Sequence, residues 1–292
     1  MARCLSWTTY PLIAMLSVAT LWFLLRCGAA LSWAPYVAAA VAGIAVFAAE
    51  GWLPYRAAWQ PTSSDVLQDG AFLVLAQVAV PLGLGWITLW LLQALLADYR
   101  ISLGLWPADY PIWVQVFLKL VIGDFLRYWL HRWSHEWSPL WRWHALHHQP
   151  RKLYGWNVFR FHPADKAFQF VFDSVPFLVL GMGRESFAYY FVIYATSGFL
   201  QHANCDLRLG WFNYLLSGPE VHRWHHAADL TDANHNYAHT LVLWDVLFGT
   251  YHRPSREVGA LGLNDPGYPS SFVGQLAAPF HRPVVETSNG DF

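Results

Sequence analysis

The chain has 292 residues, of which 55% are hydrophobic, 17% aromatic and only 13% charged. Soluble domains carry roughly a quarter of charged residues, so this composition excludes a surface that is fully exposed to water and favours a membrane protein. The net charge is −1 and the Lys and Arg residues are scattered, which excludes nucleic acid as a partner.

Four apolar runs before residue 130 predict transmembrane helices. They cover residues 10–25, 32–49, 71–97 and 111–130, and a bilayer is spanned by about 20 mostly apolar residues. A cleaved signal peptide is the alternative for the first run, but no small-residue cleavage site follows it. Because no Gly/Ser-rich linker separates the runs, we expect one integrated domain.

Two shorter apolar runs follow, at residues 167–180 and 187–200, and they are separated by the sequence Gly-Met-Gly-Arg. Each run is too short to cross a bilayer comfortably. We therefore expect a hairpin over residues 167–201 that dips into the membrane and returns.

An even number of spans places the N-terminus and everything after residue 130 on one side of the membrane. Basic residues close to membrane ends on that side are Arg132, Arg142, Arg151, Lys152, Arg160 and Lys166, against Arg26 and Arg100 on the other side. Positive charge near membrane ends favours the cytosol. The sequence thus predicts that the region after residue 130 lies on the cytosolic face.

Histidine is the unusual residue of this chain, with fourteen copies. At 3.6 residues per turn, Asp124, Tyr128, His131 and His135 share one helix face that begins inside the membrane and ends at its surface. Two triplets with the spacing i, i+3 and i+4 follow, and two single histidines lie between them. These residues are His144, His147, His148, His222, His225 and His226 in the triplets, and His162 and His202 between them.

This crowding of histidines predicts a metal site. The alternative is that they are solvated polar groups near the membrane surface, which would suffice for a single H-x-x-x-H pair. Crowding many partly desolvated imidazoles is unfavourable unless a transition metal compensates. Eight histidines in three spaced motifs exceed the three or four protein ligands of one zinc ion, so we expect two metals. The three cysteines form no C-x-x-C pair, and without thiolates iron is the favoured metal.

The three histidine motifs resemble the histidine boxes of the fatty acid hydroxylase/sterol desaturase superfamily. Further matching signatures are Asp124-x-x-x-Tyr128, Phe161-His162-Pro163, His202-Ala203-Asn204, Asn236-Tyr237 and the segment at 243–250, so that the resemblance covers about residues 111–252. It implies an integral-membrane oxygenase that uses two iron ions, dioxygen and external electrons to act on a fatty acyl chain, a sterol or a related isoprenoid lipid.

Carried over by position, the resemblance implies a core set of eight metal ligands, a probable ninth and a further candidate. The core set is His131, His135, His144, His147, His148, His222, His225 and His226, the ninth is His202 and the further candidate is His162. Some relatives have another histidine where this chain has Gly198, and many have glycine where it has Ala238. We expect His235 and His239 to lie outside the ligand set, and His252 and His281 to be solvated.

Asp124, Asp245 and Asn236 are the candidate catalytic residues outside the ligand set. We expect the two aspartates to orient ligand imidazoles through their second nitrogen. Helix capping or a surface ion pair is an equal alternative for both. No fused haem or iron–sulfur domain is visible, so electrons would come from a separate protein. Hydroxylation and desaturation need the same ligands, and both reactions stay open.

Two other function classes fit the sequence less well. A zinc-dependent membrane hydrolase would show His-Glu-x-x-His on a helix, but Trp-Ser-Pro follows His135-Glu136 and the second histidine is missing. A metal transporter or a haem-binding carrier would place histidines or carboxylates within several spanning helices, whereas here they lie at helix ends and beyond.

The predicted fold is therefore an all-α integral membrane protein with about four transmembrane helices and a membrane-dipping hairpin, capped by a cytosolic, helical, histidine-rich metal domain. Its predicted regions are transmembrane helices at 1–130, a di-iron catalytic region at 131–252 that includes the hairpin, and an extramembranous tail at 253–292.

Overall fold

The computed structural model describes residues 2–95 and 102–281, and within these residues it is helical, with three isolated β-bridges and no strand. The long elements are α1 (Ala2–Arg26), α2 (Ala34–Trp52), α3 (Ser63–Phe72), the π-helical turn η2 (Leu73–Ala79), α4 (Val80–Leu95), α5 (Ile112–Glu136), α7 (Pro163–Asp173), α8 (Val175–Leu180) and α9 (Arg184–His202). The shorter elements are η1 (Ala57–Trp59), α6 (Ser138–His148), η3 (Gly155–Phe159), η4 (Gly210–Tyr214), α10 (Pro219–His225), α11 (Leu230–Ala233), α12 (Leu243–Leu247) and α13 (Phe272–His281).

Three helices among the described residues are long and apolar enough to cross a membrane, namely Cys4–Arg26, Ala34–Trp52 and Ser63–Leu95. They overlap the first three predicted spans, although the second helix begins at Ala34 and the last two residues of the third span, 96 and 97, lie outside the described residues. The third begins earlier than predicted because α3, η2 and α4 follow one another without a break. An all-α membrane protein with a histidine-rich helical region is thus confirmed.

The fourth predicted span, 111–130, lies within α5 but does not match the other three in composition. Its buried face carries Gln115, Lys119, Asp124 and Arg127. Its outward residues are apolar, with Trp113 71%, Phe117 58% and Ile122 42% exposed. Charged residues that face a bundle interior and apolar residues that face outward are typical of a membrane helix with polar internal contacts.

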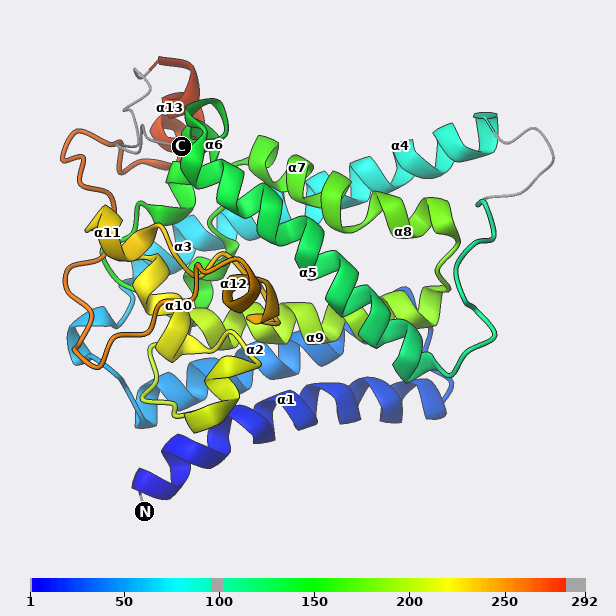
Figure 1. Ribbon diagram of the computed structural model, residues 1–292, viewed down its shortest axis with the longest axis horizontal. Coiled ribbons are helices and arrows are strands. Elements are labelled where there is room, and N and C mark those ends of the chain that lie inside the picture. The colour runs from blue at the N-terminus through cyan, green and yellow to red at the C-terminus, as the bar shows by residue number, and fades with distance from the viewer. Residues whose placement is uncertain (1, 96–101, 282–292) are drawn as a thin grey trace.

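The predicted hairpin is formed by α7 and α8 in one direction and α9 in the other (Figure 1). The turn between them passes through Gly181, whose φ of 93° is left-handed. A side chain there would be strained, and an added Cβ would lie 2.6 Å from Ser102 Oγ.

The long helices bring distant parts of the chain to one end of the bundle. The start of α1 and the ends of α2, α5 and α9 lie on the left of Figure 1, where α6, α10, α11 and α13 also gather. All the histidine motifs are carried by, or adjoin, elements at that end.

The region predicted as a separate tail, 253–292, packs against this same end over its described part. Val258 and Leu261 are buried in one apolar cluster with Trp59 and Trp224. Gln275 on α13 is fully buried and its amide hydrogen-bonds Gln149. The Pro- and polar-rich composition of this region does not predict these contacts, because the partner residues are distant in sequence. Residues 282–292 lie outside the described part of the chain.

Candidate metal centre

Nine of the ten predicted ligands converge in two adjacent groups. His131 and His135 come from the last turns of α5, three histidines from the end of α6, His202 from the end of α9 and three from α10 and the residue after it. In each group the ligand atoms all lie within 4.8 Å of one another, and every member is buried. The first group is His131, His135, His144, His148 and His225, and the second is His147, His202, His222 and His226.

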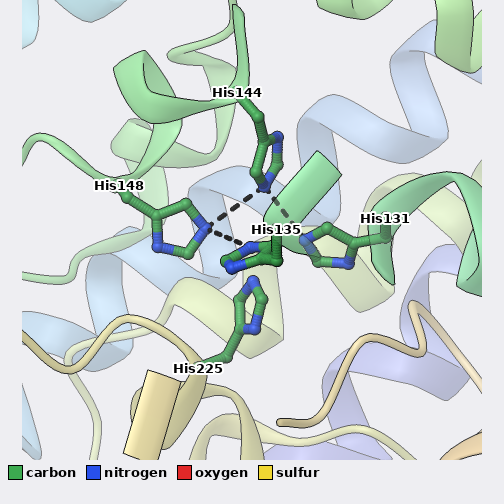
Figure 2. A group of neighbouring side chains, drawn as sticks. All are labelled: His131, His135, His144, His148 and His225. Carbon is green, nitrogen blue, oxygen red and sulfur yellow. Dashed lines mark hydrogen bonds between the residues drawn. The ribbon is translucent and has the colours of Figure 1, made fainter. Parts of the chain in front are cut away.

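Figure 2 shows the first group, in which rings from α5, α6 and α10 point toward a common centre. His144 Nε2 lies 3.0 Å from His131 Nε2 and 3.2 Å from His148 Nε2. His148 Nε2 lies in turn 3.1 Å from His135 Nε2. His225 Nε2 is buried without a hydrogen-bond partner. Five ring nitrogens are thus gathered around one point.

The hydrogen bond made by the Nδ1 atom of each ring determines whether its Nε2 atom carries a proton or a free lone pair. His131 Nδ1 faces Tyr237 O at 2.7 Å and His225 Nδ1 faces His235 O at 2.8 Å. A carbonyl oxygen only accepts, so both Nδ1 atoms carry the proton and, in the neutral rings, both Nε2 atoms present lone pairs. A proton on one Nε2 atom would turn only one of the close nitrogen–nitrogen contacts into a hydrogen bond, whereas a cation at the centre would attract the lone pairs of all of them.

The second group repeats this arrangement on a smaller scale. His222 Nε2 lies 3.1 Å from both His202 Nε2 and His226 Nε2. His202 Nδ1 faces the side-chain oxygen of Asn157 at 2.7 Å, and His147 Nδ1 faces Arg160 O at 3.2 Å. The chain therefore offers two neighbouring sets of nitrogen ligands rather than one large set.

Burial keeps these imidazoles neutral. Burial first and the neighbouring His225 second lower the pKa of His202 to about 3, and burial lowers the pKa of His225 to about 3 although the bond to the His235 carbonyl opposes it. Burial and then the ring of His226 hold the pKa of His147 and of His148 well below the usual value. Neutral rings keep the lone pairs that metal ligation requires.

The donor atoms of both groups suit a transition metal. All of them belong to imidazoles, a donor type that suits iron, zinc and copper. The closest nitrogen separations are 3.0–3.2 Å, and the ligand atoms of each group all lie within 4.8 Å of one another. The donor set therefore fits one transition-metal ion in each group.

An aspartate that the sequence analysis did not single out orients one ligand directly. Asp165 Oδ2 lies 2.8 Å from His144 Nδ1, and its Oδ1 accepts from Gln169 Nε2 at 3.0 Å. Burial would raise the pKa of Asp165, but His144 and Arg127 outweigh it and hold the pKa below its ordinary value. The sequence feature that could have indicated this role is the position of Asp165, three residues after His162 and at the start of a helix.

Asp124 and Asp245 do not touch the imidazoles, and the expectation that they orient them directly is corrected. Asp124 Oδ2 accepts from the backbone N–H groups of Thr240 and Leu241 at 3.0 and 2.6 Å. Asp245 accepts from the backbone N–H groups of Tyr237 and Ala238 at 2.8 and 2.9 Å. These acceptors fix the 237–241 backbone, whose Tyr237 carbonyl meets His131, so the two aspartates act one step further from the ligands.

Asn236 has the same kind of role. It is the one non-glycine residue with a left-handed backbone among the described residues, at φ 57°. Its side-chain amide donates to Val221 O and His252 O at 3.1 and 2.7 Å. Asn tolerates this conformation better than most residues, and the bonds tie the segment after α11 to α10. The structure thus assigns Asn236 a positioning contact.

His162 is not brought into either group. Its Nδ1 accepts from Ala164 N at 3.1 Å at the start of α7, and its Nε2 faces Leu276 O at 3.2 Å. Both nitrogens are therefore occupied. His239 stacks on Tyr194, His235 stacks on His252, and His281 is exposed.

A cavity of about 890 Å³ lies beside the first group. His135, His148 and Trp141 line it, and Arg142 and Asp229 are among its charged lining residues. Residues 256–265 and α13 contribute to its wall, so the C-terminal part of the chain helps to shape the space next to the metal ligands.

Comparisons with known proteins agree with this arrangement. The model of the family described as fatty acid hydroxylase matches residues 116–250. An ornithine lipid hydroxylase of Rhizobium tropici is 35% identical over 252 residues, which are 83% of this chain and 73% of the relative.

Two more distant relatives share the same region. The alkylglycerol monooxygenase of Homo sapiens is 28% identical over 58% of this chain and 36% of its own length. A Delta(7)-sterol 5(6)-desaturase of Aspergillus fumigatus is 27% identical over 52% of this chain and 43% of its own length. No solved structure matches the chain. These relatives confirm the resemblance drawn from the histidine motifs.

Proposed function

Because the chain belongs to the fatty acid hydroxylase family and is an oxidoreductase, we propose that it is a membrane-bound non-haem di-iron oxygenase that hydroxylates or desaturates a lipid with dioxygen. The observation that carries this proposal is the convergence of nine buried imidazoles in two groups, in which the Nε2 atoms of seven rings lie 3.0–3.2 Å from a neighbouring Nε2. Two adjacent groups support two metal ions.

The chemistry that a bound iron pair supplies is the reduction of dioxygen to an oxidant that removes hydrogen from an unactivated C–H bond. The chain's residues hold the ligands in place. Asp165 keeps the Nδ1 proton of His144 in position, and the Tyr237 carbonyl does the same for His131. Fixed tautomers leave the Nε2 lone pairs aimed at the metals.

The proposed substrate is a polar membrane lipid. Among the compared relatives, the ornithine lipid hydroxylase matches the largest share of this chain, whereas the sterol desaturase matches about half of it. A fatty acyl chain, a sterol or an isoprenoid are the wider possibilities within the family. The cavity beside His135 and His148 provides space for the reacting carbon and for dioxygen.

We further propose that the electrons come from a separate redox protein and that the metal centre lies on the cytosolic face. No haem or iron–sulfur motif occurs in the sequence. The six basic residues near membrane ends on the histidine side support the orientation.

Metal analysis of the purified protein combined with lipid mass spectrometry tests the proposal. We expect two irons per chain, and a lipid that gains one oxygen atom or loses two hydrogens only when the protein, dioxygen and a reductant are all present. One zinc per chain with lipid hydrolysis would instead identify a zinc-dependent hydrolase. A haem Soret band, or metal without any lipid product, would identify a carrier.

A further inference from the structure

Two segments of the histidine-rich region expose apolar side chains and no charge. They are residues 209–217 around η4 and 240–250 around α12, and their single charged residue, Asp245, is fully buried. We call their exposed residues the α12 patch: Trp211 63%, Phe212 46%, Tyr214 59%, Leu215 49%, Leu243 45%, Val246 51%, Leu247 63% and Phe248 36% exposed. Contiguous apolar surface of this kind marks an interaction site.

Backbone contacts join the two segments into one surface. Leu216 and Leu241 form an antiparallel bridge. On either side of it, Val242 N donates to Leu215 O at 3.1 Å and Ser217 N donates to Thr240 O at 3.0 Å. The patch therefore has a defined shape and is not a pair of independent loops.

The patch lies beside the middle of α5. Trp244 Nε1 donates to Val121 O at 3.1 Å, and the Trp244 ring lies 4.7 Å from that of Phe125. Figure 1 accordingly shows α12 alongside α5, set back from the end where α6, α11 and α13 gather. Val121 and Phe125 belong to the run 111–130, whose outward side chains are apolar, so α12 packs beside the apolar outward face of α5.

The other side of the patch meets the beginning of α1, which is one of the three helices able to cross a membrane. Arg208 N donates to Ser6 O at 2.8 Å. A Cβ added to Gly210 would lie 2.9 Å from the ring of Trp7, itself 52% exposed. The α12 patch is thus continuous with the outward apolar faces of two long helices.

We propose that the α12 patch is inserted among the acyl chains of the membrane leaflet on the side of the metal centre. Aliphatic residues with Trp and Tyr beside them are typical of segments that enter the interface. The inference concerns the membrane contact of the fold and does not depend on the reaction that the metal centre performs. It adds a second membrane contact to the predicted region 131–252, beside the predicted hairpin at 167–201.

An aromatic path connects the patch to the first histidine group. Phe248 stacks on Tyr128 with ring centres 5.3 Å apart, and Tyr128 lies 6.0 Å from Tyr237. Tyr237 lies 5.8 Å from His131 and 5.4 Å from His135. Insertion of the patch therefore places the acyl region of the leaflet two aromatic rings away from the proposed ligands.

Site-directed spin labelling of the full-length, iron-loaded protein in phosphatidylcholine nanodiscs tests the proposal. Cys4 and Cys27 are exposed and would be replaced by serine, while Cys205 is buried and stays. Labels at Val246→Cys and Leu247→Cys are compared with a label at Leu230→Cys, a residue of α11 that lines the cavity. We expect the two patch labels to collide more often with oxygen, which concentrates in acyl chains, and several-fold less often with a water-soluble nickel chelate.

Nickel access at both patch labels equal to that at position 230 would place the patch in water and overturn the proposal. Protection from both oxygen and nickel, with spin–spin broadening between labels of two chains, would show a second copy on the patch and overturn it as well. Iron content matching the unlabelled protein identifies variants that have folded. Using two patch positions keeps the test decisive if one substitution disturbs folding.

Discussion

A carboxylate outside the histidine motifs, Asp165, decides which nitrogen of His144 faces the other imidazoles of its group. Histidine spacing on a helix predicts which rings share a face, and eight of the nine histidines that gather in the structure are predicted in this way, whereas His202 follows from the family resemblance. The partners of their second nitrogens follow no such rule. Tyr237, Asn157 and Arg160 reach the rings through tertiary contacts between 13 and 106 residues apart, and two of these partners are backbone carbonyls.

Removal of a central ligand is expected to abolish activity. In His147→Ala or His225→Ala, one group loses a nitrogen that no neighbouring side chain replaces, and an incomplete metal pair loses its paired redox chemistry. Iron per chain and dioxygen-dependent lipid product are measured in membranes for each variant. His281→Ala, which removes an exposed histidine outside both groups, is the matched control. Near-normal turnover by either ligand variant would contradict the di-iron proposal.

Changes at the supporting aspartates should be milder and should differ from each other. Asp165→Asn weakens the bond to the His144 ring, for which losses of about 10–100-fold in metal affinity or activity are typical. Asp245→Asn places an amide against backbone N–H groups and acts on His131 only through Tyr237, so we expect a smaller loss of iron affinity. Iron titration of both variants against Asp206→Asn, whose side chain is 42% exposed, checks this order. A larger loss in Asp245→Asn would show that the 237–241 backbone matters more than the Asp165 contact.

Among the helices, α5 shows which features of the fold can be predicted from the sequence and which cannot. Its apolar residues predict a membrane helix, and the first three spans are confirmed by the structure. Hydropathy does not show that Lys119, Asp124 and Arg127 all turn inward, because that depends on polar groups supplied by other helices. The packing of residues 256–281 was missed for a related reason. Buried polar contacts leave no apolar period in the sequence.

The α13 helix should stabilise the fold without binding metal. Gln275 is fully buried and connects Gln68, Gln149 and Pro269 through its side-chain amide. Gln275→Ala removes these three hydrogen bonds, each contributing about 0.5–1.5 kcal/mol, while Gln68 and Gln149 keep their bonds to Ser270 and Arg160. We expect a lower thermal midpoint in detergent with iron content retained at low temperature, whereas His281→Ala should change neither. Equal midpoints for both variants would show that α13 contributes little to stability.

The orientation of the whole molecule in the membrane can be measured with its two exposed cysteines. Cys4 lies near the start of α1 and Cys27 just after its end, so the two thiols lie at opposite ends of one candidate span. The start of α1 shares its end of the bundle with the histidine motifs (Figure 1). The side on which Cys4 lies is therefore the side of the metal centre.

We expect Cys4 in the cytosol and Cys27 on the opposite face. The physical reason is that basic residues near membrane ends are held on the cytosolic side, and most of them lie at the histidine end of this chain. A maleimide that cannot cross membranes should label Cys27 in sealed right-side-out vesicles and Cys4 in sealed inside-out vesicles. Cys205 is buried, and Cys4→Ser and Cys27→Ser variants assign each signal. Labelling of Cys4 in right-side-out vesicles would reverse the orientation and move the metal centre to the external face, and labelling of both thiols from the same side would show that α1 does not span.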